Sequence, residues 1–361
     1  MSRAPFPAEA VPVPSLLRLG DFTGGRDNNF QLLRFLAATS VVVFHCYALT
    51  DHWTDEPLWR LTPELNLGAL GVKVFFVVSG FLVTQSWDTR RRLDQFVVAR
   101  ALRIYPALIV ATVWTIALAA LSSTLPATVF FTHPETGDYF WHTALGIDVR
   151  DRLPGAFARN PFPASVNGSL WTLPIELRLY LALAIAGVIG LVTRRTLWLV
   201  AIAALIALML LRPHALLDVL PGPDTQVVVE LALLFALGSL AYAWRDMVPL
   251  SIVAALVAIA IFAWNPGGYA RGALFAPLLA YIVLVAAYHP RIRWRLFNRV
   301  GDYSYGVYVY AFPIQQTVVQ RAGALEPLAL FAYAFPLVLL MAVLSWHALE
   351  RPALGLKSHF D

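Results

Sequence analysis

The stretch NNFQLLRFLAATSVVVFHCYAL (residues 28–49) predicts a membrane-spanning helix, because it consists mostly of Leu, Val, Phe and Ala. About 20 residues of helix are enough to cross the hydrocarbon core of a bilayer. Arg34 and His45 do not suit such a span, and they are eleven residues apart. At about 100° per residue, that spacing places both side chains on one face, about 16 Å apart. This face must look into the protein or into a water-filled cavity.

The rest of the chain repeats this apolar character. Hydrophobic residues make up 59% of the 361 residues and charged residues only 14%, which is too little charge for a soluble protein of this length. We expect an all-α fold, a polytopic integral-membrane bundle of about ten transmembrane helices. The predicted spans are roughly 29–50, 68–87, 103–122, 170–192, 196–212, 225–244, 248–264, 272–288, 304–321 and 328–347.

The distribution of Lys and Arg predicts the orientation. Most of them fall in the segments that share a side with the amino terminus, such as 88–102 and 289–303. Because cytoplasmic loops are enriched in Lys and Arg, both termini are expected in the cytoplasm. This distribution also explains the net charge of +5 without a basic domain, so no nucleic-acid partner is expected.

Three segments lie outside the core of predicted spans. Residues 1–27 are rich in Pro and Gly and lack the order of a secretory signal, so we expect a flexible cytoplasmic tail. A transmembrane domain is expected over 28–350 and a cytoplasmic tail over 351–361. The extracytoplasmic loop 123–169 is long and contains many aromatic residues, which favours an ordered lid or docking surface.

Ionisable residues inside spans are costly and are therefore candidates for function. They are Arg34, His45, Lys73, Glu176, Arg178 and Glu230. Counted along its span, Glu176 lies at a depth similar to His45, so the two are expected to meet. Lys73, Arg178 and Glu230 could pair with one another. A structural alternative is that His45 is a hydrogen-bonded packing residue and that Arg34 reaches the headgroups. The single cysteine, Cys46, is read as a small packing residue, since helical neighbours do not face each other.

Six motifs in order resemble the membrane acyltransferase-3 family, the O-acyltransferases of bacterial cell-surface glycans and related acceptors. They are LLRFLAATSVVVFH (32–45), GVKVFFVVSGFLVT (71–84), ARALRIYPAL (99–108), NGSLWTLPIELRLY (167–180), GDYSYGVYVYAFPIQQ (301–316) and ALERP (348–352). Many relatives carry a His where this chain has Tyr310, so no role is carried over to that position.

The resemblance implies transfer of an acyl group, expected to be acetyl, from cytosolic acyl-CoA to a hydroxyl of an extracytoplasmic glycan. His45 would be the general base because the pKa of imidazole lies near neutrality. Glu176 would orient its ring, and Arg34 would line the route between the two faces. A relay through an acylated His45 or Ser79 stays open beside direct transfer.

The remaining candidates divide between the two substrates. Arginine suits the phosphates of CoA, so the donor would be bound by Arg90, Arg91, Arg92, Arg100, Arg103, Tyr105 and Ser79. The acceptor would be bound by Lys73, Asn167, Ser169, Trp171 and Arg178. We expect no metal, and we expect a multi-pass protein of the bacterial inner membrane.

Two other functions fit part of the pattern. A proton-coupled secondary transporter would also bury His, Glu and Arg, but transporters are often built from internal repeats, and each motif here occurs once. The same acyl transfer to a small secreted acceptor, such as a macrolide, would need the same core. The sequence predicts neither the acceptor nor the oligomeric state.

Overall fold

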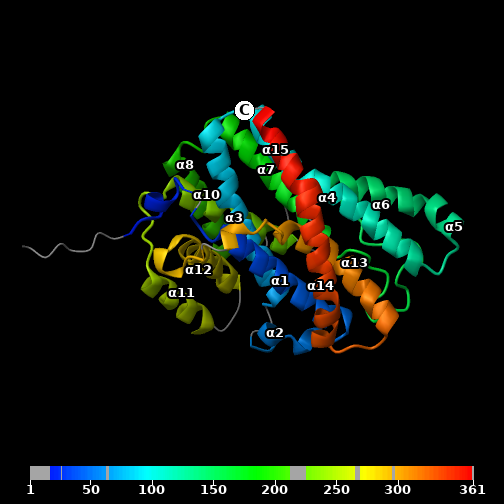
Figure 1. The fold of residues 1–361 in the computed structure, drawn as a ribbon. Coiled ribbons are helices and arrows are strands. Elements are labelled where there is room, and N and C mark those ends of the chain that lie inside the picture. The colour runs from blue at the N-terminus through cyan, green and yellow to red at the C-terminus, as the bar shows by residue number, and fades with distance from the viewer. Residues whose placement is uncertain are drawn as a thin grey trace, which may run out of the picture.

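The structure, a computed structural model, describes residues 17–25, 27–61, 65–211, 225–264, 269–294 and 297–359. Within these residues the regular elements are helices, and β-type pairing is limited to three isolated bridges. The helices pack side by side into a bundle (Figure 1). The all-helical class predicted from the sequence is therefore confirmed.

Every predicted span coincides with a helix, and the ends agree to within about four residues except that α4 begins at Leu93, ten residues before the predicted span 103–122. The ten helices are α1 (Phe30–Leu49), α3 (Leu67–Arg90), α4 (Leu93–Ser122), α7 (Leu173–Val188), α8 (Arg195–Leu211), α10 (Thr225–Ala243), α11 (Ile252–Trp264), α12 (Tyr269–Tyr288), α13 (Ser304–Ala322) and α14 (Pro327–Ser345). In the part of the chain that the structure describes, four shorter helices lie between or after them: α2 (Pro57–Leu61), α5 (Ala127–Thr132), α6 (Pro134–Leu145) and α15 (Arg351–Gly355).

Six of the described helical segments are long and apolar enough to cross a membrane. They are Phe30–Leu49, Leu67–Arg90, Leu93–Ser122, Leu170–Val188, Thr225–Ala243 and Pro327–Ser358. The chain is thus a helical membrane protein, while ten crossings and the side of the termini stay predictions. Helix α13 is too polar to belong to this set. Its polar residues are tolerated because α13 lies inside the bundle. Its Gln315 and Gln316 are fully buried, since α13 packs among α1, α4 and α14.

The ends of the helices gather at two opposite ends of the bundle. Helices α1, α4 and α13 begin where α3, α10 and α14 end, and we call this the basic end. The side-chain amide of Asn298 donates there to the backbone oxygen of Asn28 at 2.7 Å, and Gln85 donates to the oxygen of Thr23 at 3.0 Å. Spans that follow one another along the chain, such as α1 and α3 or α13 and α14, therefore run in opposite directions, as a chain that crosses repeatedly requires.

Helices α3 and α10 approach each other most closely at two glycines. A Cβ atom at Gly80 would overlap the backbone of Phe235, and one at Gly238 would overlap the backbone of Val77. Small residues at such positions let membrane helices pack backbone to backbone. This contact fixes α3, which carries Ser79, as a wall of the interior.

The described part of the predicted amino-terminal tail is bound to the bundle. The backbone N–H of Leu19 donates to Val248 at 2.9 Å, that of Gly20 donates to Arg245 at 2.8 Å, and the Leu19 side chain is fully buried. Residues 1–16 and 26 lie outside the described residues. At the other terminus, the predicted tail continues the last span as α15 and a short 3₁₀ turn.

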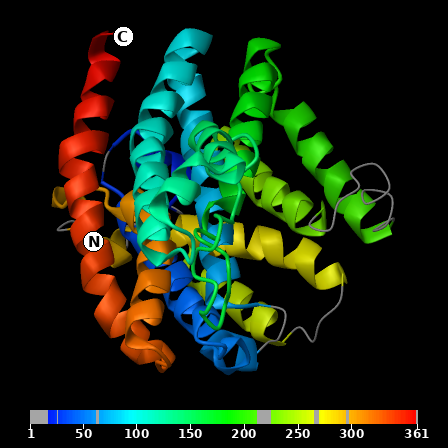
Figure 2. The same cartoon turned by 90° about the vertical axis from the view of Figure 1, so that its right-hand side faces the viewer.

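Residues 123–169 form a folded unit that we call the cap. It has a hydrophobic core of its own against the end of α4, formed by Ala119, Phe130, Tyr139, Leu153, Ala156, Phe157 and Val166. Its loop is tied to α13, because the amide of Asn160 donates to Gln316 Oε1 at 2.7 Å and that of Asn167 donates to the Val309 oxygen at 2.9 Å. The cap lies on one side of the bundle, the side that faces the viewer in Figure 2.

The predicted orientation can be tested by labelling cysteines in intact cells. Ser358 and Ala158 are both exposed on the protein, whereas the native Cys46 is only 1% exposed and gives little background. With both termini in the cytoplasm, Ser358→Cys is shielded from a membrane-impermeant thiol reagent and Ala158→Cys reacts. Labelling of Ser358→Cys in sealed cells would contradict the predicted orientation.

Candidate active site

A cavity of about 110 Å³ lies between α1, α3, α4, α7 and α13, and we call it the arginine cavity. Five residues predicted from the sequence line it together: Arg34, Ser79, Arg100, Arg103 and Glu176. They come from four different helices. The remaining wall is apolar or carries hydroxyl groups, contributed by residues that include Val72, Phe75, Leu82, Thr172, Tyr180, Tyr305 and Tyr308.

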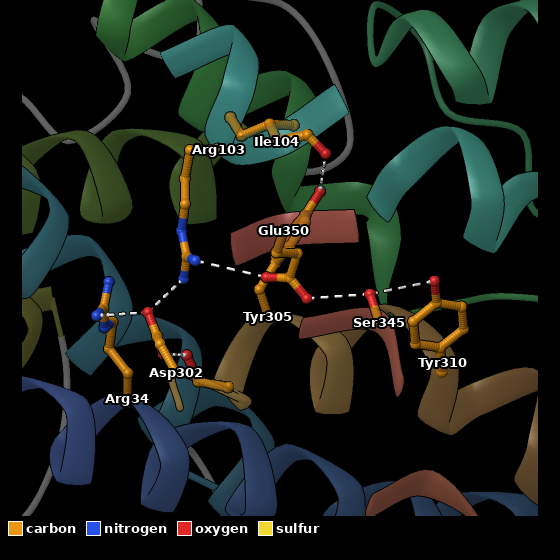
Figure 3. A network of polar contacts seen from close by, with 9 residues as sticks. Arg34, Arg103, Ile104, Asp302, Tyr305, Tyr310, Ser345 and Glu350 are labelled. Atoms are coloured by element: carbon orange, nitrogen blue, oxygen red, sulfur yellow. Dashed lines mark hydrogen bonds and ion pairs between the residues drawn. The ribbon is translucent and has the colours of Figure 1, made fainter. Parts of the chain in front are cut away.

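A chain of ion pairs holds two of these arginines (Figure 3). Asp302 Oδ2 lies 2.7 Å from Arg34 Nη2 and 2.6 Å from Arg103 Nη2. Arg103 Nη1 lies 3.4 Å from Glu350 Oε2. Burial of Asp302 opposes its ionisation, but the guanidinium groups of Arg103 and Arg34 hold the pKa of its carboxyl below the usual range. Two guanidinium groups are thus balanced by two carboxylates in the interior.

Glu350 reaches this chain from a π-helical turn, Trp346–Glu350, that follows α14. Single π turns inside α-helices often occur at functional sites. Glu350 Oε1 accepts a hydrogen bond from Ser345 Oγ at 3.0 Å, and the Tyr310 hydroxyl donates to Ser345 Oγ at 3.4 Å (Figure 3). Glu350 is 1% exposed, so its partners replace the water it has lost.

A second polar group surrounds Glu176. Its Oε1 accepts a hydrogen bond from Ser79 Oγ at 2.9 Å and another from the Tyr180 hydroxyl. Glu176 and Tyr180 are four residues apart on α7 and therefore share one face of that helix. The guanidinium of Arg100 lies 5.8 Å from the centre of the Tyr180 ring. A carboxylate, two hydroxyls and a cation thus meet on one wall of the arginine cavity.

Tyr308 closes the end of the arginine cavity that points toward the cap. Its hydroxyl donates to the backbone oxygen of Ser169 and lies 2.7 Å from Thr172 Oγ1. The hydroxyl of Ser169 itself is buried without a hydrogen-bond partner, and Asn167 Oδ1 is also unpartnered. Segment 167–172 is therefore held against α13 while two of its polar atoms stay available.

His45 lies about one helical turn beyond this closure. Its ring packs edge-on against Phe312, with 5.0 Å between ring centres, and Phe312 follows Tyr308 by four residues on α13. Gly168 approaches the same Phe312 ring so closely that a Cβ atom there would lie 2.9 Å from it. His45 Nδ1 is buried without a hydrogen-bond partner. Within the described residues no hydrogen bond or ion pair joins His45 to Glu176, so the structure does not bring these two together.

The family described as "Acyltransferase domain" matches residues 27–347, which include every residue that lines the arginine cavity. The chain belongs to the acyltransferase-3 family. The acyltransferase is 27% identical to an O-acetyl transferase of Shigella phage Sf6 over 90% of this chain and 96% of that protein. It is 28% identical to nodulation protein 10 of Rhizobium leguminosarum bv. viciae, over 94% and 96%.

A third relative is longer than this acyltransferase. The putative peptidoglycan O-acetyltransferase of Bacillus subtilis (strain 168) is 26% identical over 89% of this chain but only 54% of its own length. No solved structure matches the chain. The acyltransferase family predicted from the six motifs is confirmed by these matches.

Several predicted site residues of the acyltransferase lie outside the arginine cavity. Lys73 Nζ pairs with Glu230 Oε1 at 2.6 Å and lies over the Phe275 ring, so it forms one of the predicted pairs at the α3–α10 contact. Trp171 and Arg178 are exposed. The Tyr105 hydroxyl donates to the oxygen of Leu145 in the cap at 3.2 Å.

The arginine run at the end of α3 also lies outside the arginine cavity. Arg91 and Arg92 are exposed and pair with Asp88 and Asp94 at 2.9 and 2.5 Å, and Arg90 directly precedes them. Among the described residues, no group of three His, Cys, Asp or Glu side chains is placed to hold a metal ion.

The sequence reasoning missed the acidic partners of the arginines. Asp302 and Glu350 lie just beyond the predicted spans 304–321 and 328–347, so the rule about charges inside spans did not select them. Both stand in motifs that carried the family resemblance, GDYSYGVY and ALERP. Both acidic residues adjoin the end of a predicted span on the same side of the membrane as Arg34. This position could have identified them as partners of the arginine.

Proposed function

We propose that this protein is an integral-membrane O-acyltransferase that moves an acetyl group from acetyl-CoA to a hydroxyl of a glycan across the membrane. The donor binds from the basic end, which we place in the cytoplasm of a bacterium, and the acceptor approaches from the cap. One observation carries the proposal: Arg34, Arg100 and Arg103 line a single interior cavity together with the Ser79–Glu176 hydrogen bond. The names of the relatives, an O-acetyl transferase and a putative peptidoglycan O-acetyltransferase, support the same chemistry.

The arginine cavity has room for a short acyl group, because its volume of about 110 Å³ is several times what a single water molecule needs on the same measure, about 10–15 Å³. Arg90, Arg91 and Arg92 stand at the basic end and attract the phosphates of the approaching donor.

The transfer is a single displacement at the thioester carbonyl. The acceptor oxygen attacks the carbonyl carbon while His45 accepts the proton of the acceptor hydroxyl. The carbon–sulfur bond then breaks, and the CoA thiolate takes the proton back from the imidazolium. Arg100 stabilises the negative charge that develops on the carbonyl oxygen, because a cation in a water-poor site acts strongly. Arg34, about 16 Å from His45 along α1 and paired with Asp302, contacts the donor nearer the basic end.

Tyr308 stands between the donor and His45 in this account. Its hydroxyl must release Ser169 and Thr172 when both substrates are bound, so that the acceptor can reach the thioester. Asn167 and Ser169 then offer their unpartnered oxygen atoms to the acceptor, with the exposed Trp171 beside them. Glu176 holds Ser79 and Tyr180 in place on the donor side through its two hydrogen bonds. We assign this role to Glu176 instead of the orientation of the His45 ring that the sequence predicted.

A relay through Ser79 makes a different prediction from direct transfer. Ser79 Oγ donates to a carboxylate, which is the geometry of an activated nucleophile. Under direct transfer, Ser79→Ala retains measurable turnover and no acylated protein accumulates. Acyl groups found on Ser79 by mass spectrometry of the wild type would instead establish the relay.

The proposed function is tested with purified protein in lipid nanodiscs. Labelled acetyl-CoA and a glycan fraction from the host are supplied, and release of CoA and labelling of the glycan are measured. We expect acetyl transfer, with octanoyl-CoA a much poorer donor, and a deletion strain whose surface glycans lack O-acetyl groups. A protein that neither binds nor consumes acetyl-CoA, in a strain with unchanged glycans, would refute the proposal.

A further inference from the structure

A second cavity of about 770 Å³ lies beside the arginine cavity, and Arg34 and Leu82 line both. It lies at the basic end, where α1 begins and α3 and α10 end, and we call it the mouth cavity. We propose that the mouth cavity binds the nucleotide end of acyl-CoA, its phosphates and adenine, with Arg245 as the principal phosphate contact. This inference rests on the proposed function and adds a binding site to it.

The charge of the mouth cavity favours an anion. Arg34 and Arg245 line it, and none of the described residues in its lining carries a carboxylate. Two acidic residues that adjoin lining residues in the sequence already have partners. Asp88 accepts from Arg91 at 2.9 Å and from the Tyr242 hydroxyl at 3.2 Å, and Asp27 accepts from Arg293 at 2.7 Å. Arg34 already shares Asp302 at 2.7 Å, so Arg245, which forms no ion pair with a described residue, supplies the positive charge of the mouth cavity.

The start of α1 adds to this charge. Asn28, Phe30 and Gln31 all line the mouth cavity, so the positive end of a 20-residue helix opens onto it. The N-cap residue Asn29 does not cap α1 with its side chain, because its Oδ1 accepts from the Trp294 N–H at 2.9 Å while its amide nitrogen donates to Ala286 and Ile292. The Phe30 N–H already donates to Asn28 Oδ1 at 3.2 Å, so a phosphate would bind the other N–H groups of the first turn.

Polar atoms for the base are also present. Gln31 Oε1 is buried without a hydrogen-bond partner, so it can accept from an amino group such as that of adenine. Arg245 is held in place, since its guanidinium lies 4.4 Å from the Tyr242 ring centre and its Nη1 donates to the Tyr242 oxygen at 3.0 Å. A guanidinium fixed in this way loses little freedom when its other N–H groups bind phosphate.

The two cavities together match the shape of the donor. The nucleotide occupies the larger mouth cavity, the pantetheine arm passes Arg34 and Leu82, and the acyl group enters the smaller arginine cavity. Thr89 lines the mouth cavity and directly precedes Arg90, so the arginine run lies at its rim. The rim guides the donor, and the mouth cavity holds it.

The test compares Arg245→Gln with Arg195→Gln, an exposed arginine at the same end that lines neither cavity. Affinities for CoA and for acetyl-pantetheine, which lacks the nucleotide, are measured on protein in nanodiscs. We expect Arg245→Gln to bind CoA about tenfold to a hundredfold more weakly, which is the usual loss for one charge-assisted hydrogen bond. Its affinity for acetyl-pantetheine stays at the wild-type value, and Arg195→Gln binds both as the wild type does.

Two results would overturn the inference. One is wild-type affinity of Arg245→Gln for CoA, and the other is an equal loss of affinity for CoA and acetyl-pantetheine. Both leave the proposed function intact, provided that the wild type binds and consumes acetyl-CoA. Failure of the wild type to bind acetyl-CoA would instead refute the proposed function.

Discussion

His45→Ala is expected to reduce acyl transfer by about 10²–10⁴-fold, the usual loss for a general base. Its affinity for CoA should stay close to that of the wild type, because His45 lies beyond the Tyr308 end of the arginine cavity and does not line it. Initial rates of glycan acetylation and equilibrium binding of CoA, measured on the same preparations, separate the two effects.

The matched control for this variant is Cys46→Ala. Cys46 is the next residue on α1, is 1% exposed, and accepts a hydrogen bond from Gln315. Its replacement disturbs the packing beside His45 without removing a base, so activity should fall only slightly. If a well-folded His45→Ala protein kept most of its activity, His45 would not be the base, and a transporter with a proton relay would become the better explanation.

Asp302→Asn is expected to have the largest effect on stability. The change leaves Arg34 and Arg103 buried near each other without the carboxylate that they share at 2.7 and 2.6 Å. Removing one partner of a buried ion pair costs about 3–5 kcal/mol, because the remaining charge stays desolvated. Thermal unfolding in detergent should show a lower midpoint than the wild type, and CoA binding should be lost as the two guanidinium groups move.

Glu230→Gln provides the control for Asp302→Asn. It leaves Lys73 without its carboxylate partner in a pair that lines neither the arginine cavity nor the mouth cavity. This variant should also unfold at a lower temperature, yet the folded protein should bind CoA as the wild type does. Wild-type stability and CoA affinity in Asp302→Asn would show that the ion pairs do not hold the arginines in place.

Much of the site could be predicted because a charged residue inside a membrane span is energetically costly and therefore indicates a functional site. Arg34 and Glu176 are charges inside predicted spans, and both line the arginine cavity. Arg100, Arg103 and Ser79 followed from motifs next to spans, and the structure places them in the same cavity. Side-chain periodicity correctly indicated that Arg34 faces the protein interior.

The pairing of these residues could not be predicted in the same way. The sequence-based depth of Glu176 is the number of helical turns from the start of its predicted span. This count assumes that all spans begin at the same membrane surface. Tyr308 instead binds the oxygen of Ser169 within the bundle, so α7 begins deep and Glu176 reaches Ser79 rather than His45. Likewise, Asp302 pairs with residues more than 190 positions away, and no local spacing encodes such contacts.

Photocrosslinking of a short diazirine-bearing acyl-CoA tests most directly whether the arginine cavity receives the acyl group. The probe is activated on wild-type protein in nanodiscs, with excess CoA as competitor, and modified residues are located by mass spectrometry. The account predicts competed crosslinks to the cavity wall, at Ser79, Tyr180, Phe75 or Tyr308. Competed crosslinks confined to the cap surface or to the Lys73–Glu230 contact, with the cavity wall unmodified, would contradict it.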